Sequence, residues 1–304
     1  MTSTTTHDPS SDQQRSLRDR TPNAIQRERK DRAVKVALLG TVAFALVPLA
    51  FILGVTVYQG IGSFGWEFLT QPPPANPNEE GGGYGPMVFG TIYMVGIAVL
   101  LSVPLGIAAA VFLVEYRESR LVAPIRFFTD VMTGVPSIFV GLFVFSALVV
   151  DAGLFFGTLP GAVSLAVLML PIVVRSSEEV LRLVPDDLRN AAYGLGSRRH
   201  QVVTRVVLPA AGPGLITGSM LAVARGAGET APLLLTALGG RQLVLELTGR
   251  PQTALPLQIL DDARGAFEPA IGRAWAGALT LMLLVLLFTV IARLIGRRSQ
   301  LGGR

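Results

Sequence analysis

Six long apolar runs constrain this chain of 304 residues more than any other feature. The runs lie near residues 36–59, 87–114, 124–150, 153–174, 210–237 and 274–296. A helix of about 20 apolar residues crosses about 30 Å of hydrocarbon. A segment inside lipid must also satisfy its own backbone hydrogen bonds, and a helix does so. The sequence therefore predicts an all-α integral membrane protein with six transmembrane helices.

The composition excludes several other classes of protein. Hydrophobic residues make up 50% of the chain and charged residues 15%, whereas soluble domains carry about 25% charged residues. The net charge of +5 comes largely from segments outside the apolar runs, so it indicates orientation in a membrane rather than binding of nucleic acid. The chain has no cysteine, which rules out disulfides and cysteine-ligated metals, and we expect no cofactor.

Lysine and arginine alternate between rich and poor connecting segments. Residues 1–35 contain eight, the external loop 60–86 contains none, and residues 175–209 contain six. Residues 238–273 contain four, which weakens the alternation without reversing it. Cytoplasmic loops are enriched in these residues, so both termini and the 175–209 loop are predicted to be cytoplasmic, in a plasma (inner) membrane. Residues 1–35 are predicted to form a disordered tail because they have little apolar surface to bury, and residues 297–304 form the cytoplasmic C-terminal end.

One glycine pattern resembles a nucleotide-binding motif but lacks its context. Residues 60–65, GIGSFG, match G-x-G-x-x-G, yet they follow an apolar span and open no βαβ unit. Neither Lys30 nor Lys35 follows a glycine, so the chain has no Walker A motif. We therefore expect a transport subunit without an ATPase site of its own.

The cytoplasmic segment 185–209 has the pattern of two short helices. Pro185 and two acids begin the first, and its apolar stripe has helical spacing: Leu188, Ala191, Ala192 and Leu195. Gly194 and Gly196 end it. Ser197 is predicted to cap a second helix that ends at Pro209. The apolar face of this helix is Val202, Val203, Val206 and Val207. Such a segment could lie flat on the bilayer, or it could push a helix into a groove of another protein.

The same segment resembles the EAA loop of the permease subunits of ABC importers, whose pattern is E-A-A-x-x-x-G, nine residues, then I-x-L-P. The residues at the motif positions are Ala191, Ala192, Gly196, Leu208 and Pro209, with Asn190 where the family usually has glutamate. The resemblance implies a type-I ABC importer permease fold over residues 87–296, with this loop docked on an ATPase subunit. The change at position 190 affects a charged contact with that subunit.

Three further stretches resemble phosphate-specific permeases of this family, of the A type. They are ARGAGETAPLLL (224–235), TGVPSIFVGLFVF (133–145) and MLPIVVRSSEEVL (169–181). The resemblance covers about residues 85–296. It implies a permease subunit of a phosphate importer, with a second permease of the C type, an ATP-binding subunit dimer and an extracytoplasmic phosphate-binding protein as partners, all within membrane lipid.

The first of these stretches places two charges in an apolar span. Arg225 and Glu229 are spaced i, i+4 and share one face of a helix. Each would cost about 2.5–3.5 kcal/mol if unpaired at mid-membrane, and such residues usually mark a substrate path. Gly226 and Gly228 could open the helix there. Arg175 is a second candidate for the path. The alternatives for Arg225 and Glu229 are a structural ion pair and, for Arg175, an anchor at the membrane edge.

Other functions stay open at this point. Permeases for molybdate, sulfate or phosphonate share the architecture. An ion-coupled secondary carrier usually shows paired repeats with interrupted helices, and no second copy of the ARGAGET segment occurs. A membrane-embedded enzyme is disfavoured because His7 and His200, the two histidines, lie outside the spans and no catalytic motif is present.

Overall fold

The computed structural model describes residues 22–301 and divides the chain into two units, up to Val55 and from Thr56 onward. Helix α2 (Pro22–Gly60) supplies the described part of the first unit, and its last five residues belong to the second. From Arg29 it is long and apolar enough to span a membrane. It begins earlier than predicted, so residues 22–35 are helical, because good helix formers there extend an already formed helix. The rest of the predicted tail, residues 1–21, lies outside the described residues.

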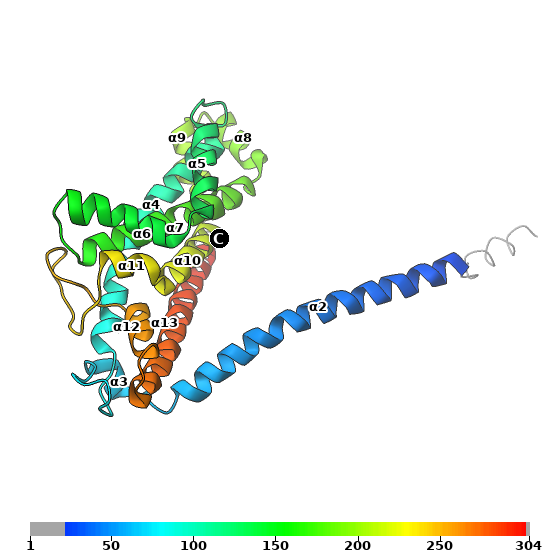
Figure 1. The fold of residues 1–304 in the computed structure, drawn as a ribbon. Coiled ribbons are helices and arrows are strands. Elements are labelled where there is room, and N and C mark those ends of the chain that lie inside the picture. The colour runs from blue at the N-terminus through cyan, green and yellow to red at the C-terminus, as the bar shows by residue number, and fades with distance from the viewer. Residues whose placement is uncertain (1–21, 302–304) are drawn as a thin grey trace, which may run out of the picture. The chain divides into compact units, whose positions relative to one another are not determined.

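The second unit consists of helices joined by loops (Figure 1). Their bounds are α3 (Trp66–Thr70), α4 (Gly85–Glu115), α5 (Val122–Gly134), α6 (Ser137–Val144), the π-helix η1 (Phe145–Asp151), α7 (Thr158–Arg182), α8 (Asp186–Gly194), α9 (Arg199–Val202), the π-helix η2 (Val203–Val207), α10 (Leu208–Gly228), α11 (Ala231–Thr236), α12 (Leu255–Ala263) and α13 (Glu268–Leu301). Between residues 22 and 301 no β-strand is present, and the sole β-bridge joins Leu238 to Gln252.

Five helices are long and apolar enough to cross a membrane, and a sixth crossing is a bent pair. The predicted third span, 124–150, is not one straight helix, because α5 and the α6–η1 segment meet at 108°. Pro136 lies at the break with an extended backbone. Proline has no N–H to donate and pushes the residue before it away from helical geometry, which explains the interruption. The prediction of six crossings therefore holds only if the bent pair counts as one.

The fifth span differs from its predicted bounds at both ends. It begins at Arg199 and runs through η2 and α10 to Gly228, so Pro209 does not end the second helix of the loop. The wider π turns of η2 lie directly before Pro209 and accommodate its missing N–H. Ser197 is not the cap: Arg198 precedes α9, and its N–H donates to Gln201 Oε1 at 2.8 Å.

The core of the second unit lies where α4, α7 and α10 meet. Buried side chains from all three form one cluster, which includes Met94, Ala98, Leu165, Met169 and Val223. Small residues bring the helices together: a Cβ at Gly106 would lie 2.6 Å from Val173 Cγ1. This is the packing expected between helices in lipid, where small residues allow close approach.

Two arginines hold the loop 60–86 that precedes α4. Arg241 donates from Nη1 to the carbonyl of Ala75 at 2.6 Å. The buried Arg273 of α13 donates to the carbonyls of Glu79 and Pro77, at 2.7 and 2.8 Å. The loop is thus fixed through its backbone oxygens.

A buried tyrosine adds a second attachment at the same end of the unit. The Tyr84 hydroxyl donates to Asp262 Oδ2 at 2.6 Å, and Arg273 Nε lies 3.6 Å from the same oxygen. Burial, and then the hydrogen bond to the carboxylate, raise the pKa of the Tyr84 phenol far above its usual range. The phenol therefore stays protonated and joins α4 to α12 and α13.

Candidate functional site

Helices α8 and α9 project at the end of the unit where α4 and α7 finish (Figure 1). We call residues 185–202 the knob. Its first helix begins with two acids in the first turn, which the helix dipole favours. The predicted apolar stripe is divided: Ala192 is buried, whereas Leu188, Ala191 and Leu195 are exposed, Leu195 by 88%. Most of the stripe is thus free to contact another surface.

The bend between the two helices depends on Gly196, as predicted. Its φ of +80° is in the left-handed region, which favours glycine. The N–H of Gly196 donates to the carbonyl of Tyr193 at 2.9 Å, and that of Ser197 to the carbonyl of Ala192 at 3.1 Å. This pair of bonds is a Schellman motif, which ends α8 and redirects the chain into α9.

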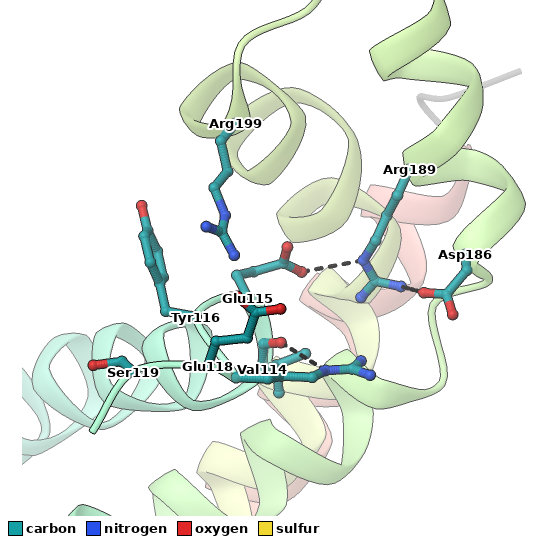
Figure 2. Close-up of a pocket in the computed structure, with 9 residues that line it drawn as sticks. Val114, Glu115, Tyr116, Glu118, Ser119, Asp186, Arg189 and Arg199 are labelled. Atoms are coloured by element: carbon teal, nitrogen blue, oxygen red, sulfur yellow. Dashed lines mark hydrogen bonds and ion pairs between the residues drawn. The ribbon is translucent and has the colours of Figure 1, made fainter. Parts of the chain in front are cut away.

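An arginine that the sequence did not single out attaches the knob to the span helices. Arg189 is 7% exposed. Its Nε donates to Glu115 Oε1 at 3.1 Å and its Nη2 to the carbonyl of Leu181 at 2.9 Å, while Nη1 donates to Asp186 and to the carbonyl of Val184. Figure 2 shows the two carboxylate contacts converging on one guanidinium. Glu115 is the last residue of α4 and is itself buried.

A second arginine of the knob reaches the same end of α4. The guanidinium carbon of Arg199 lies 4.0 Å from the ring centre of Tyr116, a cation–π contact. Between the knob and α4 is a cavity of about 430 Å³, lined by both arginines, Tyr116 and Glu118 among others (Figure 2). Sequence patterns could not reveal these contacts, since Arg189 and Glu115 are 74 positions apart. The local signal was weak: Arg189 shares a helix face with Ala192, at i, i+3.

The remaining motif residues of the loop occupy different surroundings. Asn190 is exposed, and no hydrogen bond of its side chain is seen in the described part of the chain. Leu208 packs against the buried cluster at the base of the knob, and Pro209 is exposed at the start of α10.

Arg225 and Glu229 form the expected ion pair, with Nε and Oε1 3.4 Å apart. The arginine side chain is 65% exposed and the glutamate 16%. The helix ends between them: α10 stops at Gly228, and Glu229 is extended with ψ of 127°. Gly226 is buried, and a Cβ there would lie 2.7 Å from Met169 Sδ, whereas a Cβ at Gly228 would meet nothing within 4 Å.

Arg175 belongs to a separate group of charges. It forms an ion pair with Asp130 and lies 3.6 Å from Glu178, whose buried carboxylate also binds Arg126 and Arg182 at 2.6 and 2.5 Å. Asp130 is thus the partner of Arg175. Among the described residues no ion pair joins this group to Arg225 or Glu229.

The helix arrangement is that of the transmembrane subunits of ABC importers. A chain of a bacterial alginate ABC transporter superposes with a TM-score of 0.65 at 16% identity, covering 92% of this chain and 98% of that one. A chain of the MetNI methionine ABC transporter superposes with a TM-score of 0.59 at 20% identity, covering 70% and 94%. At these identities the likeness establishes the fold.

The family follows from sequence comparison. The model described as "Binding-protein-dependent transport system inner membrane component" matches residues 102–300, and the chain belongs to this family of multi-span inner-membrane permeases. It is 40% identical over 275 residues to the phosphate transport system permease protein PstA of Yersinia pestis, covering 90% of this chain and 92% of that protein. It is 35% identical over 277 residues to PstA 1 of Mycobacterium tuberculosis, covering 90% and 91%.

Proposed function

We propose that the chain is the transmembrane permease subunit of an ATP-driven importer of inorganic phosphate, forming half of the translocation path. The observation that carries this proposal is the end-to-end similarity to phosphate permeases, at 35–40% identity over about nine-tenths of the chain. The chain serves transport and pairs with other subunits of an ABC importer. Those subunits are a second, C-type permease, a dimer of ATP-binding subunits that supplies the ATPase site, and an extracytoplasmic phosphate-binding protein.

The path runs along the exposed face of α10. That face carries Thr217, Leu221, Arg225 and Gly228, spaced by one helical turn each. An ionisable residue in a span is costly unless it faces a partner or an aqueous path. Phosphate is anionic near neutral pH, and the planar guanidinium of Arg225 matches its oxygens. Glu229 orients the guanidinium and weakens its hold on the anion, so that phosphate can leave.

The two glycines of this segment have different roles. Gly226 lets α10 approach Met169 of α7, and this contact fixes the position of the neighbouring Arg225 along the span. Gly228 leaves open space beside Arg225 at the helix end, where the anion passes. Arg175, 39% exposed, supplies a second positive charge on the path, held in place by Asp130 and Glu178.

The outer face of α8 docks on the ATP-binding subunit. Leu188, Ala191 and Leu195 give it an apolar ridge suited to a groove, and Asn190 contributes an uncharged contact there. This arrangement requires both termini and the knob to be cytoplasmic. A reporter active only in the cytoplasm, fused after residue 80, then gives no signal, and a strong signal there would reverse the orientation.

The test of the path is a double variant, Arg225→Gln with Glu229→Gln. Replacing both members of an ion pair leaves no orphan charge and is often neutral for stability, so the complex should assemble. Hydrogen bonds to charged groups contribute about 1.5–3 kcal/mol, so uptake should fall roughly 10- to 100-fold. The matched control is Glu246→Gln with Arg250→Gln, an exposed i, i+4 pair with atoms 3.6 Å apart outside the spans, and it should transport normally.

Phosphate uptake is measured in vesicles matched for assembled complex, with and without ATP. Normal uptake by the Arg225 and Glu229 double variant would make the pair a structural brace. If sulfate or molybdate inhibits uptake by the native complex more strongly than unlabelled phosphate does, the substrate is a different oxyanion. Uptake that persists when ATP hydrolysis is blocked would favour an ion-coupled carrier.

A further inference from the structure

The guanidinium of Arg189 joins three elements of the fold at one point. It leaves α8, binds the carboxylate of Glu115 at the end of α4, and binds the carbonyl of Leu181 in the last turn of α7. Helix C-termini carry partial negative charge and unpaired carbonyls, so a cation is favoured there. The contacts are buried and charge-assisted, which makes them stronger than neutral hydrogen bonds.

The backbone alone attaches α8 weakly, although α9 continues through η2 into α10. Only residues 183–185 separate α7 from α8, and Gly196 sits between α8 and α9 in open space, with nothing within 4 Å of an added Cβ. Hinges of a few residues absorb motion between rigid elements. Side-chain contacts across these hinges therefore decide whether α8 and the span helices move together.

The chain of contacts continues toward the charged pair. From the Arg189 contact at its inner end, α7 packs along α4 and α10, and Met169 of α7 lies against Gly226. Gly226 is next to Arg225. A displacement of α8 thus has a packed route to the residue that we assign to the substrate path.

We propose that Arg189 is a positioning residue that, with Glu115, latches α8 to α4 and α7, so that movement of the knob is transmitted to the translocation path. This inference rests on the proposed coupling of the knob to an ATP-binding subunit. Arg189 does not touch the substrate or the ATPase in this proposal. It acts by keeping α8 and the span helices one rigid body during the transport cycle.

The test uses the assembled importer in proteoliposomes and measures two rates, ATP hydrolysis and phosphate uptake. Three variants are compared: Arg189→Gln, Glu115→Gln and the double variant. The control is Arg205→Gln, which removes an exposed arginine beyond the knob in η2. The decisive readout is uptake per ATP hydrolysed, because a merely structural defect lowers both rates in proportion.

We expect ATP hydrolysis within about twofold of the native complex and uptake per ATP reduced between about 5-fold and about 150-fold in both single variants, the usual range of coupling between sites. The double variant should assemble better than Arg189→Gln, since no buried carboxylate is left alone, yet stay uncoupled. An unchanged ratio of uptake to hydrolysis, recovery of that ratio in the double variant, or failure of all three to assemble would overturn the latch. Failure of the native complex to use ATP for phosphate uptake would instead overturn the proposed function.

Discussion

Replacing Gly196 should weaken docking of the ATP-binding subunit in graded steps. The φ of +80° is the determining feature, because a Cβ at this position meets nothing within 4 Å. Any effect of substitution is therefore backbone strain rather than steric clash. The informative series is Gly196→Asn, Gly196→Ala and Gly196→Val, with Gly194→Ala as the control two residues away, where there is equal space and no positive φ.

The magnitudes follow from the cost of the left-handed region. An L-residue pays about 1–2 kcal/mol there, and asparagine pays less. Valine, being β-branched, is a more severe outlier. At about 1.4 kcal/mol per tenfold, Gly196→Ala corresponds to about 5- to 30-fold. Gly194→Ala should instead stabilise the end of α8, by up to about 1 kcal/mol of helix propensity.

The assay is the affinity of purified ATP-binding subunit for permease held in nanodiscs. If only the bent knob binds, strain lowers the competent fraction. The apparent Kd then rises by the full factor where the relaxed form already predominates, and by less where the bent form does. The Kd should increase from asparagine to alanine to valine, while Gly194→Ala leaves it unchanged. Equal effects of alanine at 194 and 196, or equal effects of asparagine and valine at 196, would refute the assignment of the bend to φ.

Two other substitutions test the packing at the end of the unit opposite the knob. Tyr84→Phe removes a hydrogen bond to the charged Asp262, worth about 1.5–3 kcal/mol. Because the pKa of Tyr84 is raised on folding, the stability that this hydrogen bond contributes is complete below about pH 10 and is lost as the pH rises further. The variant should therefore unfold at a lower temperature than the native protein near neutral pH, but lose less stability than the native protein in alkali. Gly90→Ala should destabilise the protein strongly, since its Cβ would lie 2.2 Å from the carbonyl oxygen of Thr253. The control is Gly96→Ala on the same helix, whose Cβ meets nothing within 4 Å and which should be tolerated. Thermal unfolding in detergent compares the two variants, and equal melting points would contradict the packing described.

The spans could be predicted because hydrophobic length is a local property of the sequence. The break at Pro136 could not, since Pro104 and Pro171 lie inside helices that continue past them. The difference is tertiary: in α6, a Cβ at Gly141 would lie 2.6 Å from Pro232 Cα, so this segment turns to pack against α11. That contact joins residues about ninety positions apart, and no window of sequence contains it.

In the candidate site, too, some features could be predicted from the sequence and others required the fold. The Arg225 and Glu229 pair and the bend at Gly196 follow from spacing and from the conformational freedom of glycine. The partner of Arg175 required the fold, and so did the burial of Arg189. An arginine on a polar-looking turn of a loop helix is ordinarily exposed, and only the position of Glu115 at the end of α4 makes this one internal.

The arginines that hold the loop 60–86 bind groups that are present whatever the side chains of the loop are. Arg241 and Arg273 contact carbonyl oxygens of residues 75, 77 and 79, and every amino acid supplies that group. Side chains in the loop are consequently free to diverge, and its surface can change without loosening its attachment. Length is the constrained property, because a deletion between residues 75 and 79 would move the carbonyls away from their donors.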